Sequence, residues 1–146
     1  GQVFDGKGFK TIIEELIKAD KFDKELESFI IFSPENSFLR RFEEEEKIVP
    51  LGIKGEGLFK LLNVFSGNGQ AELKAIKEYL KMIDWFEDLE LPKEKFQDER
   101  YINIKDRFID KNIPFLHQQS ANEGFLFLLF YLSLFISKDT PDFFAI

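Results

Sequence analysis

Hydrophobic side chains recur every three or four positions through much of the chain, which is the spacing of an amphipathic helix. This spacing predicts a short helix over residues 10–18, a helix that begins near Leu58, and a longer helix over residues 71–86. The apolar stripes are Ile12, Ile13, Leu16 and Ile17, then Leu58, Leu61, Leu62 and Phe65, then Leu73, Ile76, Leu80 and Ile83. A second short helix is expected over residues 22–29. The glycine-rich residues 67–69 should end the middle helix.

A different pattern follows Pro92, which closes the helical region. Residues 101–105 alternate between polar and apolar positions, so that Ile102 and Ile104 share one face. A turn is expected at residues 110–112, between two short apolar segments. Together these features predict a small β unit, and Pro114 indicates that one of its strands begins or lies at an edge.

The most apolar part of the chain predicts a buried helix over residues 124–137. Its continuous apolar run is about 12 residues long, whereas a membrane span needs roughly 20. After a break at 138–141, residues 142–146 predict a buried strand, and residues 29–32 are a candidate strand that Ser33 and Pro34 would end. A helix joined by a short loop to an apolar strand is typical of an α/β fold. We expect truncation at the C-terminal end, because chains rarely finish inside such a strand.

Composition narrows the possible functions. The net charge is -7, which disfavours a nucleic-acid binder, because such domains are usually basic. The chain has no Cys and one His, so it cannot form disulfides, thiolate metal sites or multi-His metal sites within one copy. Nineteen Phe residues indicate several elements that bury wide apolar faces. The N-terminal residues lack a signal-peptide pattern, and we expect a cytoplasmic protein without a membrane segment.

The residues before the apolar helix carry the candidate chemistry. Ser120 and Glu123 have the spacing of a capping box, and Asn122 is itself a good N-cap residue. Under this interpretation the segment only starts a helix. The other interpretation depends on a likeness that extends from Ser120 to the end of the chain.

This segment resembles the stretch of ABC-type ATPases that runs from the signature helix to the Walker B strand. The closest pattern is that of the OLD-like AAA ATPases, relatives of the SMC and RecF proteins. Gly124, the apolar helix, Pro141 and the final apolar strand match that pattern in order and spacing. Asn122 stands where the family usually has Ser. The Walker B acids would follow Ile146. Residues 48–112 resemble the helical insert of the same group more loosely.

The resemblance implies an α/β fold, a partial P-loop NTPase domain with a helical insert over about 48–112. Residues 113–146 would then contain the signature helix and the Walker B strand. It also implies ATP and Mg²⁺ as cofactors, a homodimer that closes around ATP, a nuclease or toxin partner, and a role in phage defence. The fragment alone would be inactive, because it lacks the phosphate-binding loop and the Walker B acids.

Four residues are candidates for binding the nucleotide in such a dimer. Asn122 and Gly124 would contact the γ-phosphate, with Ser120 as the fallback and Glu123 completing the set. A helix N-terminus suits this contact, because its free N–H groups and dipole attract anions. Glycine lets a phosphate approach the backbone, and an Asn amide can donate a hydrogen bond.

Weaker signals leave further alternatives open. Residues 1–8 nearly match a phosphate-binding loop, but Gly8 replaces the hydroxyl residue that would hold Mg²⁺, so a plain turn is favoured. His117 is either a phosphate sensor or a residue with a local partner. Trp85 and Phe86 are expected on the long helix, in the core or on a partner surface. The alternative function for the whole chain is a non-catalytic helical protein-interaction module.

Overall fold

A computed structural model describes Lys18 and residues 30–42, 51–92, 100–113, 115–138 and 144–145. The chain divides into two compact units. The first contains Gly1–Ile31 and Pro141–Ile146, and the second is Phe32–Thr140. The helices expected over 10–18 and 22–29 lie outside the described residues, apart from Lys18, and so do the acidic residues 43–46.

The described residues of the first unit include two short strands that pair in parallel. β1 is Ile30–Ile31 and β5 is Phe144–Ala145, with Ile30 opposite Phe144 and Ile31 opposite Ala145. Both strands lie within segments that the sequence predicts as strands. A parallel pair requires a crossover connection between its strands. Here the crossover is the second unit, because residues 32–140 lie between β1 and β5 along the chain.

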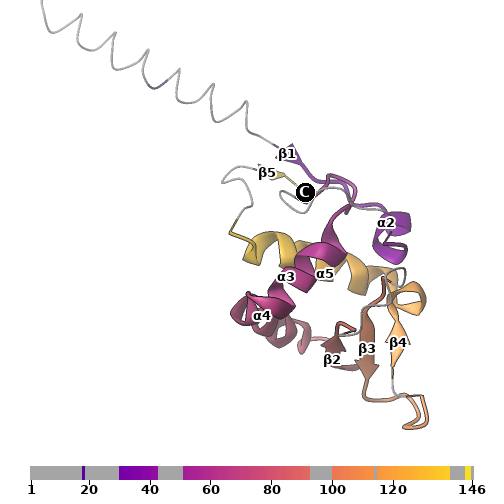
Figure 1. Ribbon diagram of the computed structural model, residues 1–146. Helices are drawn as coiled ribbons and strands as arrows, with labels where there is room; N and C mark the ends of the chain where they lie inside the picture. The colour runs from indigo at the N-terminus through magenta and orange to yellow at the C-terminus, as the bar shows by residue number, and fades with distance from the viewer. Residues whose placement is uncertain are drawn as a thin grey trace, which may run out of the picture. The chain divides into compact units, whose positions relative to one another are not determined.

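The described residues of the second unit form four α-helices, with α5 packed against the other three. They are α2 (Asn36–Arg40), α3 (Leu58–Gly67), α4 (Gln70–Leu80) and α5 (Glu123–Ile136). Figure 1 shows α3, α4 and α5 gathered beside a small sheet. The predicted stripe on α3 is confirmed, because all four of its members are buried. α5 is confirmed to within one residue at each end, whereas the short helix α2 was not predicted.

The sheet of this unit is antiparallel and three-stranded, in the order β2-β3-β4. Its strands are β2 (Phe86–Glu90), β3 (Asn103–Asp106) and β4 (Leu116–His117). Ile102 and Ile104 are both 0% exposed, which confirms that they share a buried face. The expected turn is present, since Asn112 N–H donates to Asp110 Oδ1 over 2.9 Å. The described residues therefore combine helices with a small antiparallel sheet.

The long helix predicted over residues 71–86 is wrong in its second half. α4 ends at Leu80, and hydrogen-bonded turns lead from there to β2. Phe86 and Leu89 are both 0% exposed, and a bulge between Phe86 and Asp88 lets the strand bury both side chains. Trp85 therefore lies in a turn, and Phe86 begins a strand instead of continuing a helix. Pairing with β3 outweighs the local helical spacing here.

Phenylalanine rings join the helices to the sheet in the core. The ring centroids of Phe32 and Phe130 lie 6.1 Å apart. Phe86 of β2 stacks on Phe125 of α5 at 5.8 Å, with 29° between the ring planes. Such pairs add about 0.5–1.5 kcal/mol beyond the burial of their area. The high Phe content thus stabilises contacts between segments that are distant in sequence.

Residues 52–57 form a tight turn ahead of α3. The N–H groups of Ser33 and Glu35 donate to the carbonyls of Ile53 and Lys54, at 2.9 and 2.8 Å. Gly55 adopts φ 109°, a conformation that side-chain-bearing residues rarely reach. These contacts agree with turn geometry as the reason for the glycines of this segment.

One ion pair joins α4 to β2. Lys77 Nζ lies 2.9 Å from Asp88 Oδ1. Burial raises the pKa of Asp88, but hydrogen bonds from Lys77 and from the Leu89 N–H outweigh it, so the pKa is lowered overall. A lowered pKa means that the carboxylate stabilises the fold at neutral pH. This contribution is lost as the pH falls through the folded-state pKa.

Replacing Asp88 with Asn should therefore lower stability at pH 7 by less than about 1 kcal/mol, because the pair is partly exposed. The deficit should shrink as the pH falls below about 3.9, the ordinary pKa of an Asp carboxyl, because the unfolded chain then takes up its proton. It should vanish once the folded carboxyl, whose pKa is lowered, is protonated as well. Urea denaturation at a series of pH values measures both effects. Lys77→Met provides the partner variant for a double-mutant cycle. A deficit that stays constant down to pH 3 would contradict the assignment.

Candidate functional site

The four predicted residues lie together at the start of α5, and we call them the α5 N-terminal site. Asn122 is the N-cap, and Glu123 and Gly124 are the first two residues of the helix. Ser120 is the last residue of the 3-10 helix η1 (Gln118–Ser120) that precedes the cap. All four are exposed. The sequence thus located a solvent-facing helix N-terminus.

Asn122 caps the helix through its side chain. Its Oδ1 accepts a hydrogen bond from the Gly124 N–H over 2.8 Å. An added Cβ at Gly124 would lie 3.1 Å from this oxygen, so glycine leaves room for the cap. While the cap is closed, this N–H is engaged within the chain. A phosphate that accepts from this N–H must displace the Asn122 oxygen or share the N–H with it.

The predicted capping box is wrong, although the predicted N-cap is confirmed. A capping box requires its Ser at the N-cap position and its Glu at the third helical position. Ser120 instead lies within η1, where the Ala121 N–H donates to the Gln118 carbonyl over 3.1 Å. Glu123 is the first helical residue, where the positive end of the helix dipole stabilises its negative charge.

A cavity of about 260 Å³ adjoins the site. Its lining residues are Trp85, Ile104, Asp106, Leu116, Ser120, Ala121 and Asn122. The cavity therefore brings two predicted residues together with Trp85 and Asp106, which sequence reasoning did not associate with the site. The turn before β2 and the strand β3 bring them there, and nothing local in the sequence signals it.

The charge around this cavity is mixed. Asp106 contributes a carboxylate, which accepts a hydrogen bond from the Phe108 N–H over 2.8 Å. Trp85, Ile104 and Leu116 give the cavity an apolar wall. The positive end of α5 favours an anion at Asn122, whereas the Asp106 carboxylate disfavours one beside it. The two effects therefore oppose each other within this cavity.

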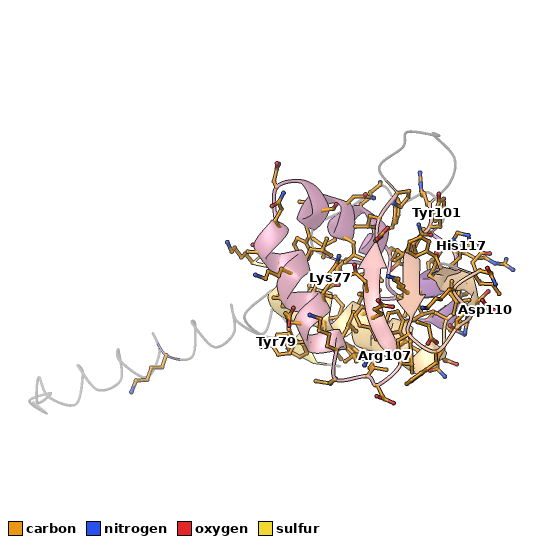
Figure 2. The ribbon with its side chains drawn as sticks, turned by 90° about the horizontal axis from the view of Figure 1, so that it is seen from below. Lys77, Tyr79, Tyr101, Arg107, Asp110 and His117 are labelled. Atoms are coloured by element: carbon orange, nitrogen blue, oxygen red, sulfur yellow. The ribbon has the colours of Figure 1, made fainter. Side chains whose placement is uncertain are left out.

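His117 lies just before the site and contacts Tyr101 (Figure 2). The ring centroids are 4.8 Å apart, and the planes meet at 81°. His117 belongs to β4 and pairs with Asn103 in the sheet. The interpretation of His117 as a residue with a local partner is therefore confirmed.

A second cavity, of about 480 Å³, lies between α4 and the sheet, where Figure 2 labels Lys77. Four of its lining residues are lysines: Lys74, Lys77, Lys81 and Lys105. Three of these form ion pairs: Lys77 with Asp88, Lys81 with Glu78, and Lys105 with Glu87. Because carboxylates balance most of the positive charge, this cavity does not present a concentrated anion site.

The described residues contain no group of three or more His, Cys, Asp or Glu side chains that could hold a metal ion. Across the same part of the chain, no helix has both the length and the apolar character needed to cross a membrane. A scan against protein-family models and searches of curated proteins and solved structures found no match to this chain.

Proposed function

We propose that this chain is part of the ATP-binding domain of an ABC-type ATPase that dimerises around Mg-ATP. The observation that supports this most is the parallel pairing of β1 with β5. β5 follows α5 after a short connection and would be the Walker B strand. Residues 48–112 would contain the helical insert, and α5 would be the signature helix that precedes this strand. Parallel pairs of apolar strands are typical of α/β sheets that bear nucleotide sites at their carboxyl ends.

In this proposal the α5 N-terminal site binds the γ-phosphate of an ATP molecule held by the other copy. The helix dipole and the amides of the first turn attract the phosphate. Asn122 acts both as the cap and as a donor, because its side chain has an acceptor oxygen and a donor NH₂ group. Phosphate binding would release the cap from Gly124. ATP would thus hold two copies together, and hydrolysis would separate them.

Mg²⁺ and the hydrolytic acids belong to parts of the domain outside these residues in this proposal. The resemblance also suggests a nuclease or toxin as the partner that the dimer drives. The chain's own contribution is the phosphate contact and the dimer contact around it. A complete gene product that contains this chain is therefore the right material for the test.

Three substitutions of Asn122 separate capping from phosphate binding. Asp and Ser are both good N-cap residues, so Asn122→Asp and Asn122→Ser should unfold at nearly the wild-type denaturant concentration. Asn122→Ala should lose about 1 kcal/mol. The Asp variant, however, places a carboxylate against the γ-phosphate. It should weaken Mg-ATP-dependent dimerisation at least tenfold, since like charges in contact cost several kcal/mol.

Analytical ultracentrifugation of the complete gene product with and without Mg-ATP measures dimerisation. Asn122→Ser is the matched control, because it keeps the cap and the hydroxyl that the family uses. Trp85 is the chain's single Trp, and its ring lies 5.2 Å from Phe125 in the first turn of α5. Its fluorescence should therefore change when ATP binds. If Asn122→Asp dimerises as the wild type does, the site does not bind the phosphate.

The closed cap favours the alternative, a protein-interaction module without nucleotide. The Gly124 N–H is already satisfied within the chain. A gene product that neither binds ATP nor dimerises with it would support this alternative.

A further inference from the structure

A buried glutamine lies directly before the α5 N-terminal site. Gln118 is 0% exposed and is one of two buried polar residues in the described part of the chain. Buried amides are costly unless they are hydrogen-bonded. Both polar atoms of the Gln118 side chain are hydrogen-bonded here, which offsets the cost of burying them.

The partners of Gln118 come from two separate segments. Its Oε1 accepts a hydrogen bond from the Ile102 N–H over 2.8 Å. Its Nε2 donates to the carbonyls of Arg40 and Arg100, at 3.3 and 3.4 Å. One side chain thus joins the end of α2, the approach to β3 and the loop that leads into α5.

The Arg40 side chain also forms a hydrogen bond to the loop before α5. Its Nη1 donates to the carbonyl of Gln119. Two hydrogen bonds of opposite direction therefore tie the last residue of α2 to residues 118 and 119. Ser120 and Asn122 follow within four positions of Gln118. A displacement of α2 would consequently pull on the residues that form the site.

We propose that Gln118 is the positioning residue of the α5 N-terminal site and that, together with Arg40, it couples the site to α2. The coupling itself depends only on hydrogen bonds within the second unit. Its consequence for ATP-driven dimerisation rests on the proposed function. When α2 shifts, the hydrogen bonds of Gln118 and Arg40 move the loop before α5 and change whether Asn122 can contact a phosphate. α2 would then regulate the site without contacting the ligand.

Hydrogen–deuterium exchange of the complete gene product tests the coupling without any nucleotide. Arg40→Ala removes the bond to Gln119 and should speed the exchange of amides 119–126 about fivefold, the factor expected for one net hydrogen bond. Amides of α3 should exchange at the wild-type rate. Arg41→Ala is the control, because it removes the same charge from the adjacent position. Faster exchange throughout the second unit would indicate general destabilisation and overturn the proposal.

Gln118→Glu provides a second variant that keeps the shape of the side chain. Its carboxylate can still accept from the Ile102 N–H but cannot donate to the carbonyls of Arg40 and Arg100. Exchange should therefore rise both in residues 119–126 and at the end of α2. Unchanged exchange in these two segments would contradict the coupling.

The functional consequence has its own readout. If wild-type protein dimerises with Mg-ATP, Arg40→Ala should weaken that dimerisation severalfold, and Arg40→Lys should partly restore it. Normal dimerisation of Arg40→Ala, despite faster exchange at 119–126, would overturn the regulatory role alone. Absence of ATP-dependent dimerisation in the wild type would refute the proposed function, while the exchange experiment would still decide the coupling.

Discussion

Replacing Phe130 with Ala should destabilise the protein by about 3–5 kcal/mol, the range for deleting a buried aromatic ring. Phe130 is 0% exposed, and its ring contacts Phe32 at 6.1 Å and Tyr131 at 5.5 Å. The substitution would leave a cavity at the centre of α5, between the helix and the segment that leads into α2. Urea denaturation followed by circular dichroism measures the loss.

Phe135→Ala is the matched control for this prediction. It makes the same change on the same helix, but Phe135 is 60% exposed. Phe135→Ala should lower the free energy of unfolding much less, because folding buries only a small part of the Phe135 side chain. Equal losses for the two variants would show that α5 does not bury the face that the structure assigns to the core.

Replacing Gly55 with Ala should cost about 3 kcal/mol, from two additive causes. The φ of 109° at Gly55 strains any residue with a Cβ by about 1–2 kcal/mol. The added Cβ would also lie 2.6 Å from Leu39 Cδ2. Leu39 is itself 0% exposed, so it can retreat only by disturbing the core, which adds about 1–3 kcal/mol. The thermal unfolding midpoint and urea denaturation both measure this effect.

Gly67→Ala tests the same substitution where neither cause applies. Gly67 ends α3, and an added Cβ would meet no atom within 4 Å. This variant should be as stable as the wild type or more stable by about 0.5 kcal/mol, because Ala restricts the unfolded chain. A wild-type stability for Gly55→Ala would contradict the turn geometry of residues 52–57.

Elements with a strong local signal were predictable from the sequence. α5 follows from a long apolar run with an N-cap residue before it, and the stripe on α3 follows from helical spacing. β2 was missed because Ile83 continues the apolar spacing of α4, so local periodicity favours a helix there. Only pairing with β3, more than ten residues further along, shows that residues 86–90 form a strand. Local patterns do not contain such non-local pairing.

In the candidate site too, some residues were predictable from the local sequence and others were not. Asn122 and Gly124 were predictable because capping is a local property of the chain. Trp85 and Gln118 were not, because their relation to the site depends on the sheet and on α2. The capping box was wrong because η1 occupies the position that the pattern assigned to the N-cap. The residue types therefore predicted where the helix begins, whereas the contacts that support this terminus could be identified only from the folded structure.

The coding sequence on both sides of this stretch tests the central proposal most directly. The ABC-type interpretation predicts an Asp and a second acidic residue directly after Ile146, at the end of β5. It also predicts a phosphate-binding loop with a Gly-Lys-Ser or Gly-Lys-Thr ending upstream of Gly1. A reading frame that contains neither feature would contradict the proposal. Asn122 would then be a helix cap alone, and the chain would be a protein-interaction module.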